Sequence, residues 1–279
     1  MGLTVAIPAS LVSDIPHLRE KTSRLGMIGR ALAIFRINEV IVYPDKLMEN
    51  QRHDAELISV VLRYMETPQY LRKRLFPILP VLKYASILPP LRTPHHPLTK
   101  RIADLIDGEY RDGVVVKTGK NTLVDIGFER PIRLNEGNAP LGKRITVRIV
   151  KHTSKIRIQK YDKSKISNIY WGYHVGISNA TLAQMLSGGV FDLVILTSKY
   201  GKPLIEVIGE LKRRWIEAKN RLIVFGSPKQ GIREILKCDG LDMDEVDSLV
   251  INTIPSQGTK TIRTEEAIFA TLAVINLFV

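Results

Sequence analysis

The fold is decided by two segments near the carboxyl end, RLIVFGSPKQGIREIL (residues 221–236) and SLVINTIPSQGTKTIRTEEAIFATLAVINLFV (residues 248–279). Each contains a short apolar run, Leu222–Phe225 or Leu249–Ile251, that stops at a loop with glycine or proline before a helical pattern. Such runs are typical of buried parallel strands, and open α/β sheets bind ligands beyond the carboxyl ends of their strands. The two loops are therefore candidates for a ligand site, although glycine and proline also punctuate loops that only connect strands to helices.

The last helical pattern begins at Thr264, which can cap it, and places Glu265 and Glu266 in the first turn, where the helix dipole favours acids. Its body, AIFATLAVINLFV, is apolar nearly all round, which predicts burial in the fold or in a subunit interface. It is shorter than the ~20 apolar residues of a membrane span, so we expect no membrane partner.

The beginning of the chain alternates strand and helix patterns. Leu3–Ile7 and Asn38–Tyr43 have the character of buried strands, whereas residues 16–35 and 50–66 carry apolar side chains at helical spacing. This alternation predicts a parallel sheet. Six prolines between residues 77 and 97 then exclude a continuous helix and place a domain boundary near Pro89.

A different pattern follows the prolines. Short β-rich runs separated by Gly, Asn and Pro occupy Gly113–Lys117, Thr122–Ile126, Arg144–Val150 and Lys155–Gln159. The last two runs alternate: Ile145, Val147 and Ile149 share one face opposite Arg144, Thr146 and Arg148, and Ile156 and Ile158 oppose Lys155, Arg157 and Gln159. Closely spaced short strands suggest a small barrel, and the OB-fold is the usual barrel that binds nucleic acid. The pattern of strand and helix returns with a helix capped at Ser178-Asn179, a strand at Phe191–Leu196, the loop 197–201 and a helix from Pro203 to about Ala218. We therefore expect an α/β domain formed by residues 1–88 and 166–279, interrupted by an inserted barrel at residues 89–165.

The charge of the chain points to a polyanionic partner. The formal net charge is +13, and the stretch from Lys143 to Lys165 holds nine basic residues against one acid, Asp162. A solvated strand face is the simpler explanation, but it does not account for this imbalance, so we expect a surface that binds RNA phosphates. Tyr161, Tyr170 and Trp171 are aromatic residues near this stretch that could stack on bases or pack in the core. The expected RNA contacts in the barrel are Arg144, Arg148, Lys151, Lys155, Arg157 and Lys160.

Several other classes of site are not expected. Gly113–Asn121 has the wrong glycine spacing for a phosphate-binding P-loop and lacks its Ser or Thr. The histidines, including His95-His96 in the proline-rich linker, have no metal-ligand spacing, and Cys238 is the single cysteine, so we expect no metal. One cysteine and the absence of a signal-peptide pattern also favour a reducing, cytoplasmic location.

The string NTIPSQGT (252–259), with RTEEA (263–267) after it and FGSPKQG (225–231) ahead of it, resembles the trefoil-knotted carboxyl terminus of the SPOUT RNA methyltransferases. The similarity covers the whole chain and is greatest to the archaeal and eukaryotic branch with a β-barrel inserted in the catalytic domain. It implies an α/β knot with a parallel sheet, an OB-like insert, a homodimer, and S-adenosylmethionine bound in a bent shape among three knot loops. Knots are essentially absent from protein folds, so that expectation rests on the resemblance.

The resemblance also assigns residues to the S-adenosylmethionine site. The three loops would offer backbone groups to the ligand, and small or apolar residues would allow it to approach closely. No metal is required, because the sulfonium supplies the electrophile. The expected cofactor contacts are Thr197, Ser198, Gly201, Phe225, Gly226, Ser227, Pro228, Gly231, Ile232, Asn252, Thr253, Ile254, Pro255, Gln257, Gly258, Thr259, Thr261, Ile262 and Ala267.

Arginine is the expected catalytic side chain. TSRLGMIGRALAIF (22–35) resembles the first motif of the ribose-methylating SPOUT branch, whose arginine is catalytic, and this similarity singles out Arg30. The asparagine and final glycine of that motif are not in place, so Arg36 competes with Arg30, and a surface or dimer-interface salt bridge is an equal alternative. Arg263 beside the third loop could contact RNA or cofactor. Glu265 or Glu266 could act as a general base, although both suit a structural role at a helix start.

Two functions remain open from the sequence. The first is an S-adenosylmethionine-dependent RNA methyltransferase, acting on ribosomal RNA, with N3-methyluridine as the expected product and a 2′-O-methyl ribose as the next. The second is a non-catalytic RNA-binding or ribosome-assembly protein that retains the fold.

Overall fold

The chain forms two compact units in the computed structural model. Residues 2–99, 101–135, 137–152, 155–166 and 168–277 are described. Unit 1 consists of Met1–Arg63, Val81–Pro89 and Tyr173–Val279. Unit 2 consists of Tyr64–Pro80 and Pro90–Gly172, so the polypeptide passes from one unit to the other four times.

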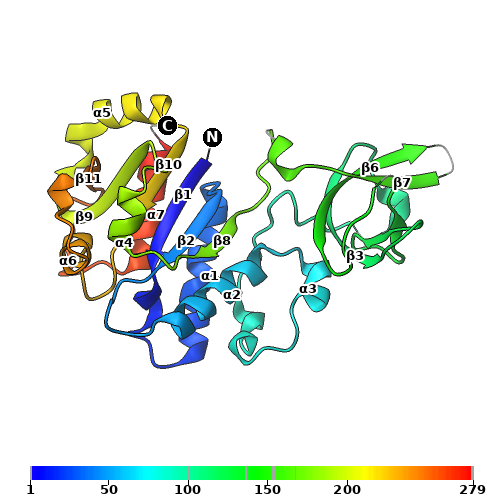
Figure 1. The fold of residues 1–279 in the computed structure, drawn as a ribbon, viewed down its shortest axis with the longest axis horizontal. Coiled ribbons are helices and arrows are strands. Elements are labelled where there is room, and N and C mark those ends of the chain that lie inside the picture. Colours follow the sequence, from blue (N-terminus) through cyan, green and yellow to red (C-terminus); the bar gives the residue numbers. More distant parts are fainter. Residues whose placement is uncertain (1, 100, 136, 153–154, 167, 278–279) are drawn as a thin grey trace. The chain divides into compact units, whose positions relative to one another are not determined.

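Unit 1 is built on a six-stranded sheet in the order β11-β9-β10-β1-β2-β8, in which every recorded pair of neighbours is parallel (Figure 1). The expected parallel sheet is therefore confirmed. Its strands are β1 (Gly2–Pro8), β2 (Glu39–Tyr43), β8 (His174–Ile177), β9 (Leu193–Pro203), β10 (Asn220–Val224) and β11 (Leu249–Asn252).

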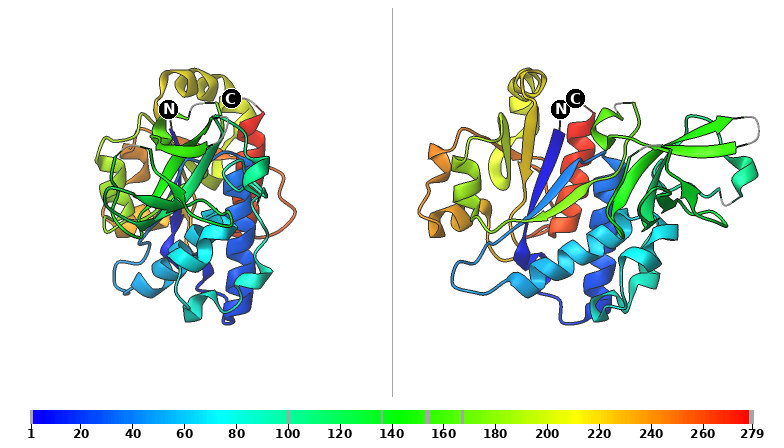
Figure 2. Two further views of the ribbon diagram at one scale, coloured as in Figure 1. Left: turned by 90° about the vertical axis from the view of Figure 1, so that its right-hand side faces the viewer. Right: turned by 45° about the vertical axis from the view of Figure 1, so that its right-hand side comes forward.

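Helices cover both faces of this sheet, as two further views show (Figure 2). Seen edge-on, α4 and α6 lie against one face and α1 and α7 against the other. Phe35, which follows α1, meets Phe269 of α7 with ring centroids 6.5 Å apart. The helices of this unit are α1 (Leu18–Ile34), most of α2 (Arg52–Glu66), α4 (Leu182–Ser187), α5 (Leu204–Glu217), α6 (Ile232–Cys238) and α7 (Thr264–Asn276), with 3-10 turns η1 (Ala9–Val12), η3 (Ala85–Ile87) and η6 (Met243–Glu245).

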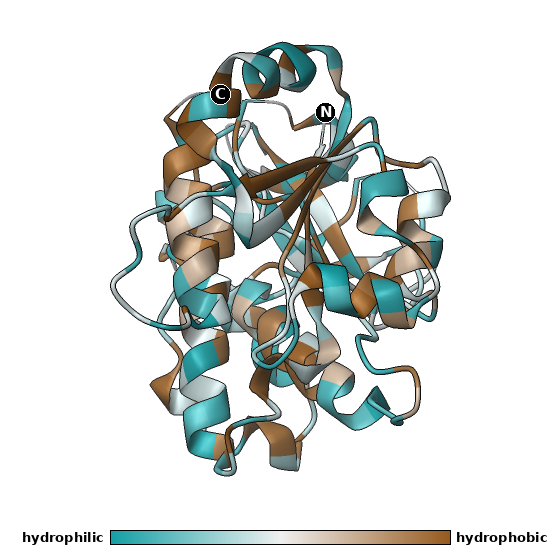
Figure 3. Cartoon of the chain, turned by 90° about the vertical axis from the view of Figure 1, so that its left-hand side faces the viewer, coloured by the Kyte–Doolittle hydropathy of each residue, from teal (hydrophilic) through white to brown (hydrophobic). Residues whose placement is uncertain are grey.

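The central strands of the sheet consist mainly of hydrophobic residues, as their brown colouring in Figure 3 shows. Ala6 of β1 belongs to the cluster shared with α4 and α6, while its neighbours Val5 and Ile7 point to the opposite face, and all three are completely buried. This two-sided burial explains why the strands form continuous apolar runs rather than alternating ones.

Four details of unit 1 differ from expectation. The cap of α4 is Thr181, whose hydroxyl accepts from the Gln184 N–H, rather than Ser178-Asn179. Thr264 is the first residue of α7 rather than its cap, because its hydroxyl turns to another loop. Residues 197–201 continue β9 rather than forming a loop, with a shift in the β9–β11 register between Val250 and Ile251. The sequence analysis did not predict β8, because a strand of four residues is too short to show a clear hydrophobic pattern.

Unit 2 is a nearly closed, largely antiparallel barrel of five strands in the order β5-β4-β3-β6-β7. A parallel bridge between Leu134 and Ile158 brings the β5 end to β7, and its core includes Val124, Val147 and Ile149. The strands are β3 (Tyr110–Lys117), β4 (Leu123–Asp125), β5 (Ile132–Arg133), β6 (Arg144–His152) and β7 (Lys155–Lys160). The last turn of α2, α3 (Gln69–Leu75), η4 (Ile102–Asp104) and η5 (Lys163–Lys165) also belong to this unit, and η2 (Pro80–Leu82) begins at its edge.

Candidate functional site

The loop after β10 is tied to the elements around it. The Ser227 N–H and hydroxyl both donate to the Gln230 carbonyl, at 3.0 and 3.2 Å, which closes the loop on itself. The Gly231 N–H donates to the Glu234 carboxylate at 2.6 Å, which begins α6. The Thr264 hydroxyl donates to the Gly226 carbonyl at 3.4 Å, so the start of α7 meets this loop.

The loop after β11 is held by its own polar side chains. The Asn252 amide donates to the Lys199 carbonyl at 2.8 Å, while its oxygen accepts from the Ile254 N–H at 2.9 Å. The Thr253 hydroxyl is 2.9 Å from that of Thr271 in α7. The segments 197–203, 225–232 and 252–264 are therefore brought together at the carboxyl ends of β9, β10 and β11.

Two glycines in this region lie where chain segments approach closely. A Cβ on Gly201 would lie 2.7 Å from the Ile251 carbonyl carbon, so the crossing of β9 and β11 excludes any side chain there. A Cβ on Gly226 would lie 3.2 Å from the Gln230 carbonyl oxygen. Of the other expected cofactor contacts, Phe225 and Ile232 are buried, and the following are half-buried or exposed: Ser198, Pro228, Pro255, Gln257, Gly258, Thr259, Thr261, Ile262 and Ala267.

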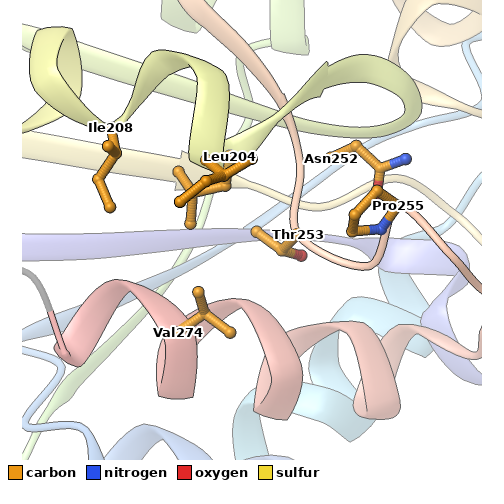
Figure 4. Close-up of a pocket in the computed structure, with 7 residues that line it drawn as sticks. Leu204, Ile208, Asn252, Thr253, Pro255 and Val274 are labelled. Atoms are coloured by element: carbon orange, nitrogen blue, oxygen red, sulfur yellow. The ribbon is translucent and has the colours of Figure 1, made fainter.

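An apolar hollow of about 170 Å³ opens between α5, the loop after β11 and α7 (Figure 4). Asn252, Thr253 and Pro255, three of the residues expected to contact the cofactor, line it from the loop. The remaining lining residues were missed: Leu204, Ile205, Ile208 and Val274. Their spacing along the helices identifies these side chains only as apolar, and nothing in the local pattern indicates that they face a hollow. This volume is below the ~300 Å³ at which whole ligands are usually enclosed.

The expected catalytic residues lie on or beside α1. Arg30 is half-buried and lies between Arg24, which forms an ion pair with Glu265 of α7 at 3.1 Å, and Phe35, which contacts Phe269. Arg36 is exposed just after the helix, with a φ of 56°. At about 100° per residue, Arg24 and Phe35 share the face of α1 that meets α7, whereas Arg30 lies roughly 120° round the helix from that face.

The two candidate bases at the start of α7 are engaged locally. Glu265 is 4% exposed and bonds Arg24, while Glu266 accepts from the Arg263 N–H at 2.9 Å in a capping arrangement. These contacts give both carboxylates the structural role that was the alternative in the sequence analysis. The Arg263 side chain itself is exposed beside the third loop.

The basic residues of the barrel fall into two groups. Arg148 is exposed on the outer face, in one cross-strand row with Tyr110 and Gln159, and Arg157 lies on the same face, 2.8 Å from the Asn135 side-chain oxygen. Lys151 and Lys160 are also exposed. The side chain of Lys155 lies outside the described residues.

Arg144 does not join this exposed group. Its guanidinium is bonded by both Nη atoms to the Glu66 carboxylate, at 2.6 and 3.0 Å, and also to the Asp112 carboxylate. Asp112 additionally accepts from the Thr146 hydroxyl at 2.7 Å and the Trp171 indole N–H at 3.1 Å. Arg144 lies on the outer face of β6, as strand alternation predicts. Residues distant in sequence, including Glu66, cover it there.

Two histidines complete this internal network, and neither is a simple linker residue. His95 is completely buried, and its Nε2 lies 3.0 Å from the Glu66 carbonyl oxygen and 3.4 Å from a Glu66 carboxylate oxygen. Burial opposes ionisation of Glu66, but His95 and Arg144 together lower its pKa to about 2. Burial, followed by the neighbouring His95, lowers the pKa of His96 to about 4.

Aromatic side chains border the open part of the outer face. The Tyr110 and Tyr161 rings have centroids 4.7 Å apart, and both are half-buried. Trp171 is 6% exposed and packs 6.1 Å from Tyr110, and Tyr170 is also buried. Trp171 and Tyr170 therefore pack inside the unit, whereas Tyr110, which the sequence analysis did not select, lies beside Arg148.

Metal sites and membrane spans are two further classes of feature to consider in the described residues. Across the described ranges, no three His, Cys, Asp or Glu side chains are grouped as a metal site would require. None of the helices in the part of the chain that the structure covers has the length and apolar character needed to cross a bilayer.

Comparison with known proteins gives a match over nearly the whole chain. Residues 2–275 match the family described as "Putative RNA methyltransferase". A human protein named 28S rRNA (uridine-N(3))-methyltransferase is 30% identical over an alignment that covers 98% of this chain and 77% of the human one. The protein of the same name from Drosophila melanogaster is 31% identical, over 98% and 61% of the two chains. An uncharacterised protein of Halobacterium salinarum is 33% identical over 99% of each chain.

Proposed function

The chain belongs to the family described as "Putative RNA methyltransferase", and on that premise we propose that it methylates the N3 nitrogen of a uridine in ribosomal RNA. The match over nearly the full length to proteins named for this reaction is the observation that carries the proposal. Ribose 2′-O methylation is the second candidate, because of the similarity around Arg30.

S-adenosylmethionine is the methyl donor that the family implies, and when bound it supplies an electrophilic methyl group. The residues at the carboxyl ends of β9, β10 and β11 fit such a ligand. Gly201 and Gly226 keep the backbone free of side chains where chain segments approach closely, and Asn252 and Thr253 offer polar groups beside an apolar hollow. We propose that these segments hold the cofactor through backbone groups and that their arrangement is the SPOUT-type knot.

Arg30 is the proposed catalytic side chain. The uracil N3 carries a proton that must leave as the nitrogen accepts a methyl group, so negative charge develops on the base. A guanidinium stays charged at working pH and stabilises such charge, or it anchors the RNA phosphate. Its half-buried position on α1, off the face that packs against α7, supports contact with a partner chain or with RNA.

Two further parts of the proposal concern partners. Ile205 on α5 is 74% exposed beside the apolar hollow, and Leu277 after α7 is 75% exposed, which supports association with a second copy of the chain. The exposed Arg148 and Arg157, with the Tyr110–Tyr161 pair at the border, support RNA binding by the barrel, which we take to be OB-like. We propose the cytoplasm as the location.

The test is methylation of ribosomal RNA lacking the mark, with labelled S-adenosylmethionine, followed by digestion and mass spectrometry. We expect 3-methyluridine; 2′-O-methyluridine would favour the second candidate. Arg30→Ala should reduce turnover by about 10²-fold or more while leaving cofactor affinity unchanged, whereas Arg36→Ala should retain most activity. RNA binding without methyl incorporation would favour a non-catalytic ribosome-assembly protein instead.

A further inference from the structure

Three consecutive backbone carbonyls at the end of β10 each accept a hydrogen bond from a side-chain hydroxyl. Thr197 of β9 donates to Val224 O at 2.8 Å, and Tyr43 of β2 donates to Phe225 O at 2.7 Å. Thr264 of α7 donates to Gly226 O at 3.4 Å. The donors come from three elements far apart in sequence. They converge on the start of the loop after β10, residues 225–232, which we call the glycine loop.

Tyr43 reaches the farthest of the three. The order of strands places β1 between β2 and β10, so the phenol extends past the end of β1 to meet Phe225. The side chain is completely buried in the cluster shared with α4 and α6. Burial, followed by the charges of Asp45 and Asp239, raises the pKa of the Tyr43 phenol, so it remains a hydrogen-bond donor at every working pH.

The hydrogen bond to Phe225 has a geometric consequence for the next residue. The Phe225 N–H donates to Ala6 O at 3.0 Å, so both polar groups of Phe225 are fixed. A trans peptide is planar, and its N–H points opposite to its C=O. Holding the Phe225 carbonyl against a buried phenol therefore directs the Gly226 N–H away from the interior, toward the half-buried side of the loop.

We propose that Tyr43 is a positioning residue for cofactor binding, which orients the Phe225–Gly226 peptide so that its N–H faces the ligand. This inference rests on the proposed function, because it takes the ligand to be S-adenosylmethionine. Tyr43 lies outside the three loops, and its role is to set one of them in the binding conformation before the cofactor arrives, which reduces the ordering that binding requires.

The experiment compares Tyr43→Phe with a matched control, Tyr173→Phe. Tyr173 is 2% exposed in the same unit, and its phenol donates to Leu62 O at 3.2 Å, away from the glycine loop. Each variant loses one buried hydroxyl bonded to a carbonyl without a change of shape, so both should melt at a lower temperature. The cofactor affinity of each folded variant is measured by calorimetric titration with S-adenosylmethionine.

We expect Tyr43→Phe to weaken binding about five- to tenfold and Tyr173→Phe to leave it unchanged. A second variant, Thr264→Val, removes the 3.4 Å hydrogen bond to the Gly226 carbonyl and should also weaken binding, by a smaller factor. Equal affinities for Tyr43→Phe and wild type, or equal losses in the two tyrosine variants, would overturn the inference while leaving the proposed function standing. Absence of binding by the folded wild type would overturn the proposed function and this inference with it.

Discussion

The end of β10 in unit 1 and the network around Glu66 in unit 2 stabilise buried polar groups in different ways. In unit 1, neutral hydroxyls of Thr197, Tyr43 and Thr264 bind neutral carbonyls at the end of β10. In unit 2, the network around Glu66 is made of charges, with Arg144 between two carboxylates and His95 beside them.

This difference has energetic consequences. A neutral hydrogen bond contributes about 1 kcal/mol, whereas removal of one partner from a buried ion pair leaves an uncompensated charge. The neutral hydrogen bonds at the end of β10 can fix the shape of the glycine loop without placing a charge beside it. The charged network around Glu66 holds distant segments of unit 2 in a single arrangement, and it depends strongly on pH.

The largest effect is expected for Arg144→Met. This change leaves the Glu66 and Asp112 carboxylates buried without their cation, so unit 2 should lose about 3–5 kcal/mol of stability. Hydrogen exchange resolved by peptide would measure the loss in each unit. Arg148→Met is the matched control on the same strand and should change stability by less than about 0.5 kcal/mol. If the two variants exchange alike, the charged network does not hold unit 2 together.

The second-largest effect is expected at low pH, where unit 2 should lose stability because of its charged network. The lowered pKa of Glu66 means that its contribution, about 3 kcal/mol, is present above pH 4.5 and is lost as the pH falls toward about 2. The lowered pKa of His96 acts in the same direction between pH 6.5 and about 4, because the unfolded chain binds its proton first. Peptides of unit 2 should therefore lose exchange protection in two steps as the pH is lowered from 7 toward 2, first between pH 6.5 and about 4 through His96 and then below pH 4.5 through Glu66. His96→Gln should remove the earlier part of this loss; an unchanged profile would contradict the assignment.

The exposed basic face of unit 2 should show a smaller, salt-dependent effect. Arg148→Gln and Arg157→Gln should each weaken RNA binding and reduce the slope of log affinity against log salt by about 1, because each removes one phosphate contact. Lys237→Gln changes an exposed cation of unit 1 and serves as the control. Equal slopes for all three variants would show that the barrel face does not bind the RNA phosphates.

The smallest effect expected is that of Gly226→Ala. The added Cβ lies 3.2 Å from the Gln230 carbonyl oxygen, so the glycine loop must widen by a few tenths of an ångström. We expect cofactor affinity to fall about three- to fivefold, roughly 1 kcal/mol. Gly209→Ala on α5 meets no atom within 4 Å and should leave the affinity unchanged while raising stability slightly. Unchanged affinity in Gly226→Ala would place the ligand elsewhere.

The sequence was most informative where structure is local. Apolar runs predicted the parallel sheet, and the alternation in 143–159 predicted which side of β6 and β7 is buried, because both patterns follow from strand geometry. The covering of Arg144 and the burial of His95 were not predictable from local pattern. Both depend on Glu66, on the proline-rich stretch that contains His95, and on Trp171. These parts of the chain come together only in the folded unit.

The candidate site shows the same limit. The loops at 225–232 and 252–259 were recognisable by their glycines and prolines, and their convergence was implied by resemblance. The role of Tyr43 was hidden, because a tyrosine at a strand end is indistinguishable from an ordinary core residue until its hydroxyl is seen against Phe225. The extension of β9 through 197–203 was also missed, because Gly201 marks a turn in most sequences but here marks a close crossing.

The most direct test of the central claim is hydrogen exchange of the full chain with and without S-adenosylmethionine. The cofactor should protect amides in residues 225–232 and 252–262, at the carboxyl ends of β10 and β11, and leave the barrel strands from 110 to 160 unchanged. Protection confined to the barrel, or no protection in either loop at saturating cofactor, would contradict the account.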